Sequence, residues 1–137
     1  MDSDIIMKRL SVRTDIVSCI GTVVEFLEDA PVLLDQNLVF KEIVCDCKDE
    51  LLNNTCYRTL AADDFDCSCR EFDIYLKYIL MSAENVIAYV RDIRKFTDSM
   101  FLYTIYNFVE SRLDELRRSV VQNLPGAFLD EYKKEKK

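Results

Sequence analysis

The sequence is poor in the residues that build turns, and it lacks histidine and tryptophan altogether. Only 2 Gly and 2 Pro occur in 137 residues, whereas 50% of the residues are hydrophobic. An all-β fold needs many turns, and glycine and proline are the residues that form them most readily. The scarcity of both therefore predicts an all-α fold, with residues 1–137 forming one helical domain and the charged stretch 133–137 a frayed tail.

The lack of histidine also bears on catalysis, because histidine is the commonest general base in enzymes. The sequence offers no glycine-rich loop that would cradle a phosphate. Of the 6 cysteines, Cys45, Cys47 and Cys67 stand beside Asp46 or Asp66, whose negative charge opposes formation of the reactive thiolate. We therefore expect a protein that is not an enzyme and needs no cofactor.

Charge and hydropathy exclude two further classes of function. The net charge of -7 disfavours nucleic-acid binding, which needs a basic stripe along the phosphate backbone. No run approaches the ~20 apolar residues of a transmembrane helix, and Met1 to Asp4 do not resemble the start of a secretory signal. We expect a cytoplasmic protein with reduced thiols, and the spacings Cys45-x-Cys47 and Cys67-x-Cys69 do not suit a zinc site.

Apolar residues recur at helical spacing through most of the chain. Within the first predicted helix, Gly21 indicates a close approach by a neighbouring helix. The apolar side chains between 68 and 93 surround nearly the whole helix, which predicts a buried central helix with Ile79, Met81, Val86 and Val90 in the core. The predicted helices run from a cap at Ser11 or Thr14 to Asp29, from Asp35 or Asn37 to Leu52, from Thr55 to Ala62, from Ser68 to Ile93, from a cap at Thr97 or Asp98 to Gln122, and through Phe128, Leu129 and Tyr132.

Three segments carry motifs that suggest binding. Phe40, Val44, Cys47 and Leu51 recur at i, i+4, i+7 and i+11, with Asp49 two residues before the last of them. A second, acidic segment runs from Leu60 to Arg70. The third runs from Gln122 to Tyr132, where Pro125-Gly126 precedes Ala-Phe-Leu-Asp-Glu-Tyr.

In this order the three segments resemble the third, first and second homology motifs of the Bcl-2 family. The resemblance implies a Bcl-2-like bundle, in which amphipathic helices wrap an apolar central helix. It also implies binding: an amphipathic BH3 helix of a pro-apoptotic partner, Bim-like or Bak/Bax-like, lies in a hydrophobic groove while its aspartate meets an arginine. That arginine would be Arg70, and the groove would be lined by Val44, Cys47, Leu51, Tyr57, Leu60, Phe65, Phe72, Leu76 and Tyr132.

The first motif departs from the family pattern Asn-Trp-Gly-Arg, since residues 67–70 read Cys-Ser-Cys-Arg. The missing glycine and tryptophan imply a narrower groove that selects few ligands. Such eroded motifs on a compact chain are similar to those of viral anti-apoptotic members, for example from iridoviruses and poxviruses. The resemblance thus implies an inhibitor of apoptosis in the host-cell cytoplasm, brought to mitochondria by its partners.

Simpler interpretations stay open for the same residues. The motif from Phe40 to Leu51 is also what the core face of any amphipathic helix looks like, and Arg70 suits a surface ion pair with Asp66 or Asp73. Tyr132 suits a terminal helix that docks on the core. An alternative function is a viral decoy of the same fold that binds immune-signalling adaptors through its surface, without a working groove. A death-fold module is a third possibility, and a homodimer that covers part of the groove is expected from so apolar a surface.

Overall fold

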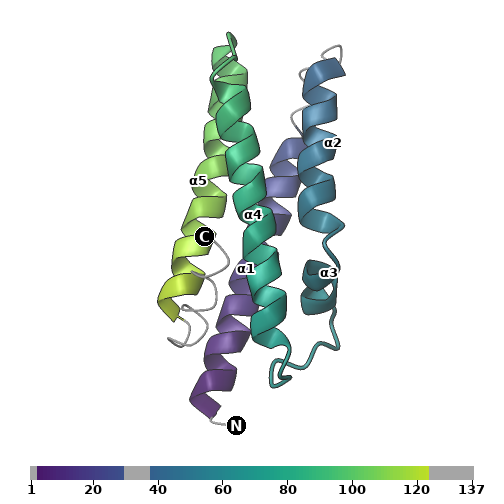
Figure 1. Ribbon diagram of the computed structural model, residues 1–137, viewed down its shortest axis with the longest axis vertical. Helices are drawn as coiled ribbons and strands as arrows, with labels where there is room; N and C mark the ends of the chain where they lie inside the picture. The colour runs from purple at the N-terminus through teal and green to yellow at the C-terminus, as the bar shows by residue number, and fades with distance from the viewer. Residues whose placement is uncertain (1–2, 30–37, 124–137) are drawn as a thin grey trace.

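The computed structural model describes residues 3–29 and 38–123, and within these ranges it is built from α-helices alone. They are α1 (Ser3–Asp29), α2 (Leu38–Leu52), α3 (Thr55–Ala61), α4 (Phe72–Arg94) and α5 (Met100–Asn123) (Figure 1). The predicted all-α fold is confirmed. Within the described ranges, no helix combines the length and the apolar character that crossing a membrane requires.

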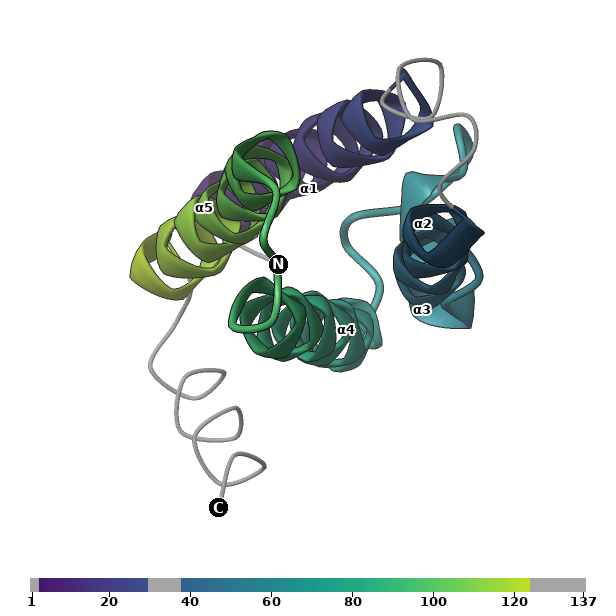
Figure 2. The same ribbon diagram turned by 90° about the horizontal axis from the view of Figure 1, so that it is seen from above.

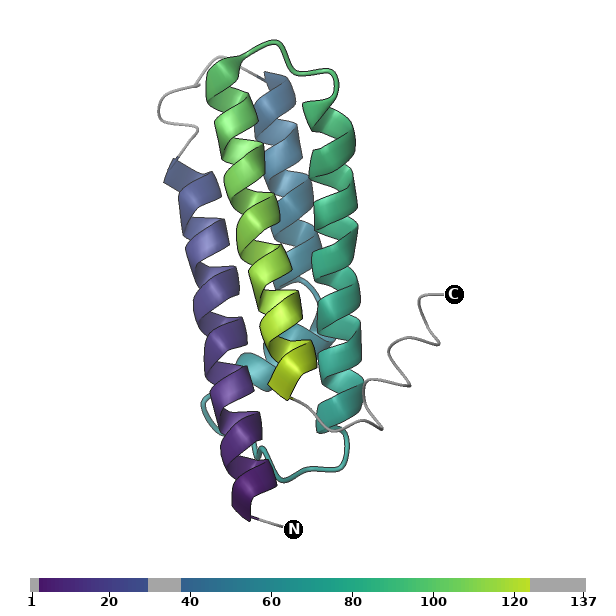
Figure 3. The ribbon, with the colours of Figure 1, turned by 90° about the vertical axis from the view of Figure 1, so that its left-hand side faces the viewer.

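The four long helices alternate in direction along the chain (Figure 1, Figure 3). The helix α5 packs between α1 and α4, while α2 and the short α3 below it pack mainly on α4 (Figure 2). Such an up-and-down arrangement follows from short connections between consecutive antiparallel helices. It makes α4 the helix that joins the two halves of the bundle.

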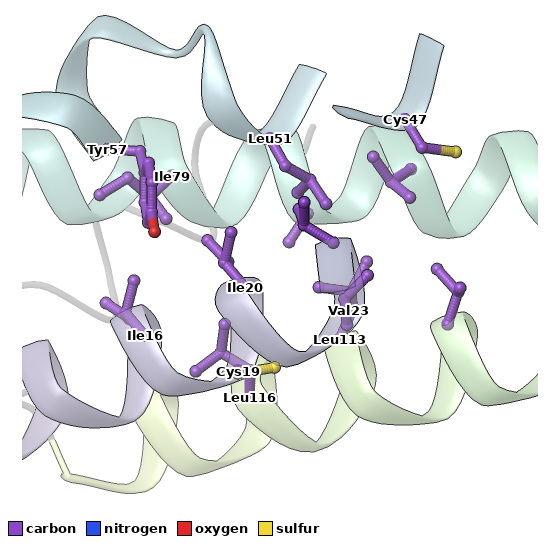
Figure 4. Close-up of a cluster of buried hydrophobic side chains, with 14 of the residues drawn as sticks. Ile16, Cys19, Ile20, Val23, Cys47, Leu51, Tyr57, Ile79, Leu113 and Leu116 are labelled. Atoms are coloured by element: carbon purple, nitrogen blue, oxygen red, sulfur yellow. The ribbon is translucent and has the colours of Figure 1, made fainter. Parts of the chain in front are cut away.

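The core draws on all five helices (Figure 4). Among the residues predicted for the centre of α4, Ile79, Val86 and Val90 are buried as expected, but Met81 is only half-buried. The helix is also less enclosed than predicted, because it exposes a face that includes Ile74, Tyr78 and Asn85. The apolar side chains of α4 therefore lie partly in the core and partly on the exposed surface.

The first helix begins at Ser3, well before the predicted cap. Thr14 does not cap it, because the Thr14 hydroxyl donates to the carbonyl of Leu10, 3.0 Å away, within the helix. The buried face continues through Val12 to Arg9, which is only 8% exposed. A buried arginine interrupts the apolar stripe, which is why the periodicity did not reveal this first part of the helix.

The ends of the other helices follow local side-chain chemistry. The amide of Tyr57 donates to the Asn54 side chain at 3.0 Å, so Asn54 caps α3. The predicted start of α4 at Ser68 is wrong, since the Asp66 carboxylate accepts from both the amide and the hydroxyl of Ser68 and holds a turn there. At α5 the capping side chain is Ser99, whose hydroxyl accepts from the Leu102 amide.

Gly21 does not mark a close approach between helices. It lies on the exposed side of α1, and a Cβ atom built there would meet nothing within 4 Å. The prediction from sequence was wrong because a glycine inside a helix has the same appearance whether a neighbour requires it or not.

The burial of Ile79 predicts a large loss of stability on truncation. Ile79→Ala should lower the free energy of unfolding by about 2–5 kcal/mol, because it leaves a cavity in the core. Ile74→Ala, on the same helix at a position 52% exposed, is the matched control and should change it by less than about 1 kcal/mol. Chemical denaturation of both variants measures the difference, and equal effects would contradict the assignment of the buried face.

Substitution of Gly21 should have the opposite effect and increase stability. Gly21→Ala should raise the free energy of unfolding by about 0.5–1 kcal/mol, because alanine loses less backbone entropy in a helix and nothing obstructs its methyl group. Thermal unfolding should show a higher melting temperature. A lower one would mean that the surface of α1 at this position is covered in solution.

Candidate functional site

The structure brings most of the predicted groove residues together, but it buries them. Val44, Cys47 and Leu51 of α2 and Tyr57 and Leu60 of α3 belong to the same core cluster as two residues of α4. The seven buried members are Val44, Cys47, Leu51, Tyr57, Leu60, Phe72 and Leu76, and each is at most 9% exposed. In this conformation their side chains are buried and join α2 and α3 to α4.

Phe65 is the predicted groove residue that stays partly accessible. It lies in the connection between α3 and α4, and the centre of its ring is 6.1 Å from that of Phe72 and 6.1 Å from that of Tyr75. Both pairs are tilted, the geometry that aromatic rings favour. Phe65 therefore covers the first turn of α4 and lies at the surface where the predicted groove would begin.

Arg70 is exposed in the turn before α4, and within the part of the chain that the structure describes its side chain has no hydrogen bond or ion pair. The two carboxylates suggested as its partners are engaged elsewhere. Asp66 accepts from Ser68, and Asp73 lies 3.7 Å from the guanidinium of Arg9. The guanidinium of Arg70 is thus accessible to a ligand carboxylate.

The segment that resembles the second homology motif, from Gln122 to Tyr132, falls almost entirely in residues 124–137. Tyr132 therefore lies outside the described residues, and its assignment to the groove stays a prediction.

Two arginines of α1, which the sequence patterns did not single out, hold the connection that contains Arg70. Arg9 donates to the carbonyls of Cys67 and Cys69 at 3.0 and 3.2 Å, and its guanidinium lies 4.9 Å from the centre of the Phe72 ring. A buried guanidinium needs such acceptors, and stacking on an aromatic face adds to its stability. The first homology-like motif is therefore fixed to α1.

Arg13, one helical turn further on, holds the end of α3. Its Nε donates to the carbonyl of Leu60 at 2.8 Å, and its Nη2 donates to that of Ala62 at 2.8 Å and of Ala61 at 3.4 Å. The last carbonyls of a helix have no partner within the helix, and their partial negative charge favours a cation. A fork of several N–H groups suits this task better than a lysine ammonium does. We refer to Arg9 and Arg13 as the arginine clamp.

The spacing of the arginine clamp in the sequence could have predicted that both arginines face the core. Arg9, Val12, Arg13 and Ile16 lie at i, i+3, i+4 and i+7, so both arginines share the face of the apolar residues. Charged residues at core-facing positions of a helix require partners inside the protein, and here those partners are backbone carbonyls.

The buried thiols are unreactive in this arrangement. Burial first, and the neighbouring Asp46 carboxylate second, raise the pKa of Cys47 to about 12. Burial likewise raises the pKa of Cys19 to about 11, although Arg112 opposes it. Thiolate, the nucleophilic form, is therefore scarce at both positions near neutral pH.

No family model, curated protein or solved structure matches the chain.

The clamp predicts that Arg13 stabilises the turn before α4 as well as the fold. Arg13→Ala should lower the free energy of unfolding by roughly 1.5–3 kcal/mol, because hydrogen bonds to a charged donor are lost. Amide hydrogen exchange should also become faster in residues 63–71. Arg13→Lys should restore part of the stability, and Lys8→Ala, at an exposed position of α1, should change neither quantity.

The idea that Arg13 contributes to fixing this turn fails if exchange in residues 63–71 is the same in Arg13→Ala as in the wild type, since the direct bonds to Cys67 and Cys69 come from Arg9. In that case the loss of stability would come from the end of α3 alone.

Proposed function

We propose that the protein is a helical binding module that inhibits apoptosis by sequestering the BH3 helix of pro-apoptotic Bcl-2 proteins. The observation that carries the proposal is the exposure of Arg70 and its position before α4. This residue is exposed in a turn that the arginine clamp holds in place, and it directly precedes the helix on which the predicted groove residues of α2 and α3 converge. A positioned guanidinium next to apolar side chains suits a helix that carries an aspartate beside its apolar face.

Binding in a groove requires α2 and α3 to separate from the first half of α4. These two helices pack mainly on α4 and less on α1, so the required movement opens chiefly the interface with α4. The ligand would replace the apolar contacts that α2 and α3 lose. Because only the open form binds, the apparent affinity falls in proportion to the fraction of open molecules. Narrow selectivity follows, since a weakly binding helix cannot offset the cost of opening.

The alternative is a decoy that binds immune-signalling adaptors through its outer surface. The burial of seven predicted groove residues favours it, because a closed groove offers a ligand helix nothing to enter. Under this alternative the partner contacts the exposed helix faces, such as the one that carries Ile74 and Tyr78.

Titration of fluorescent BH3 peptides against the protein separates the two functions. A panel with Bim-like and Bak- or Bax-like sequences should contain one or a few peptides that bind at submicromolar concentration, with slow association because opening comes first. If no peptide of the panel binds at tens of micromolar, the groove function is excluded and the decoy function stands.

Arg70 provides the mutational prediction. Removing one partner of a largely buried charge pair costs about 2–5 kcal/mol, so Arg70→Ala should weaken peptide binding at least about tenfold. The melting temperature should hardly change, because Arg70 has no partner among the described residues.

Arg58→Ala is the matched control, since Arg58 is also exposed and lies on the neighbouring α3. It removes the same charge and should leave peptide affinity within about twofold. Equal affinities for the Arg70→Ala protein and the wild type would remove Arg70 from the binding site.

A further inference from the structure

A hollow lies at the other end of the bundle from Arg70. It is formed where the first turns of α2 meet the last turns of α4 and the start of α5, at the end where α4 and α5 are joined (Figure 1). Its volume of about 680 Å³ is in the range of sites that hold ligand groups. The lining residues are Val39, Phe40, Glu42, Ile43, Asp46, Tyr89, Ile93, Phe96, Thr97, Asp98, Ser99, Leu102 and Tyr106.

The hollow has an apolar floor and an apolar rim. Phe40, Ile43 and Tyr106 are buried and close it from below, whereas Val39 is 69% and Phe96 86% exposed at its edge. Leu38 and Met100, next to the rim in the sequence, are 75% and 78% exposed. A group of large apolar side chains exposed at the mouth of a hollow is typical of an interaction site.

The charged residues that line the hollow are acidic. Glu42, Asp46 and Asp98 line it, and within the described residues neither lysine nor arginine does. Asp46 is held in place, because the hydroxyl of Tyr89 donates to its Oδ2 at 2.7 Å. Burial first, and this hydrogen bond second, raise the pKa of Tyr89, so the phenol remains a donor. The second oxygen of Asp46 is left for a partner.

We propose that this hollow docks a basic amphipathic helix of a partner protein. One large apolar side chain of that helix enters the hollow between Ile43 and Phe96, and its lysines or arginines face Glu42, Asp46 and Asp98. A second copy of this chain suits the site less well, because the chain carries a net charge of -7 and would bring like charges together. The site shares no residue with the predicted groove, so this inference does not depend on the proposed function.

The test is selection from a displayed library of random 16-residue peptides against the full-length protein. Selection on the wild type with counter-selection on the Phe96→Ser protein should enrich peptides that combine net positive charge with at least one large apolar residue. Enrichment of acidic or neutral peptides, or of none, would overturn the proposal.

Variants then locate the site, with the enriched peptide as the probe. Phe96→Ser and Asp46→Lys should each weaken binding at least tenfold. Met7→Ser and Asp64→Lys are matched controls, because they change an exposed apolar side chain and an exposed carboxylate outside the hollow, and both should bind as the wild type does. Arg70→Ala should also bind normally, which separates this site from the groove.

Phe96 and Asp98 are exposed, so Phe96→Ser and Asp98→Lys are expected to fold even if Asp46→Lys does not. Equal binding by the wild type, Phe96→Ser and Asp98→Lys proteins would overturn the proposal. Sedimentation supplies a further check: if the protein dimerises and Phe96→Ser abolishes the dimer, the occupant is a second copy and the basic partner is rejected.

Discussion

The arginine clamp is the interaction on which the arrangement of α3, the turn with Arg70 and the start of α4 depends. The connection between α3 and α4 has few apolar residues to hold it, and the carbonyls at the end of α3 have no partners within their own helix. Arg13 of α1 supplies those partners, and Arg9 of α1 bonds to two carbonyls of the connection, at sequence separations of 47 to 60 residues. These hydrogen bonds tie the turn with Arg70 and the start of α4 to α1, in addition to the Asp66 turn and the burial of Phe72. A loop that resembles a binding motif thus owes its shape to a helix that contains no part of the motif.

The rest of the bundle is organised around α4, which packs on α5, α2 and α3. Ion pairs reinforce the apolar contacts between α4 and α5: Glu110 bonds to both Arg91 and Arg94, and Glu84 pairs with Arg117. Burial opposes ionisation of Glu110, but the hydrogen bonds from the two arginines outweigh it and lower its pKa. The contact of α4 with α2 and α3 depends on apolar packing and on hydrogen bonds of uncharged donors. Asn54, which caps α3, donates to Ser82 of α4, and Asn85 and Tyr89 of α4 donate to Glu50 and Asp46 of α2. The two sides of α4 are therefore held by different chemistry.

The sequence was sufficient for the fold class, the number of long helices and most of the core, because apolar periodicity reports directly on the buried faces. It was insufficient where a polar side chain determines the local structure. The buried Arg9 hid the start of α1, the Asp66 turn shortened α4, and Gly21 has no packing role. For the candidate site, the pattern grouped residues of α2, α3 and α4 that lie in one core cluster, but it could not show whether their shared face is open or closed. That depends on the free-energy difference between packing against α4 and packing against a ligand, which spacing does not encode.

The two candidate sites require different positions of α2 relative to α4. A helix that enters the predicted groove requires the second half of α2, with Cys47 and Leu51, to leave α4. A helix that docks in the acidic hollow contacts the first half of α2 together with the last turns of α4, and so favours the packed arrangement. Because α2 is one continuous helix of 15 residues, its two halves do not move independently. A partner at the hollow would therefore lower the affinity of the groove for its ligand, and by linkage the ligand would lower the affinity of the hollow to the same degree.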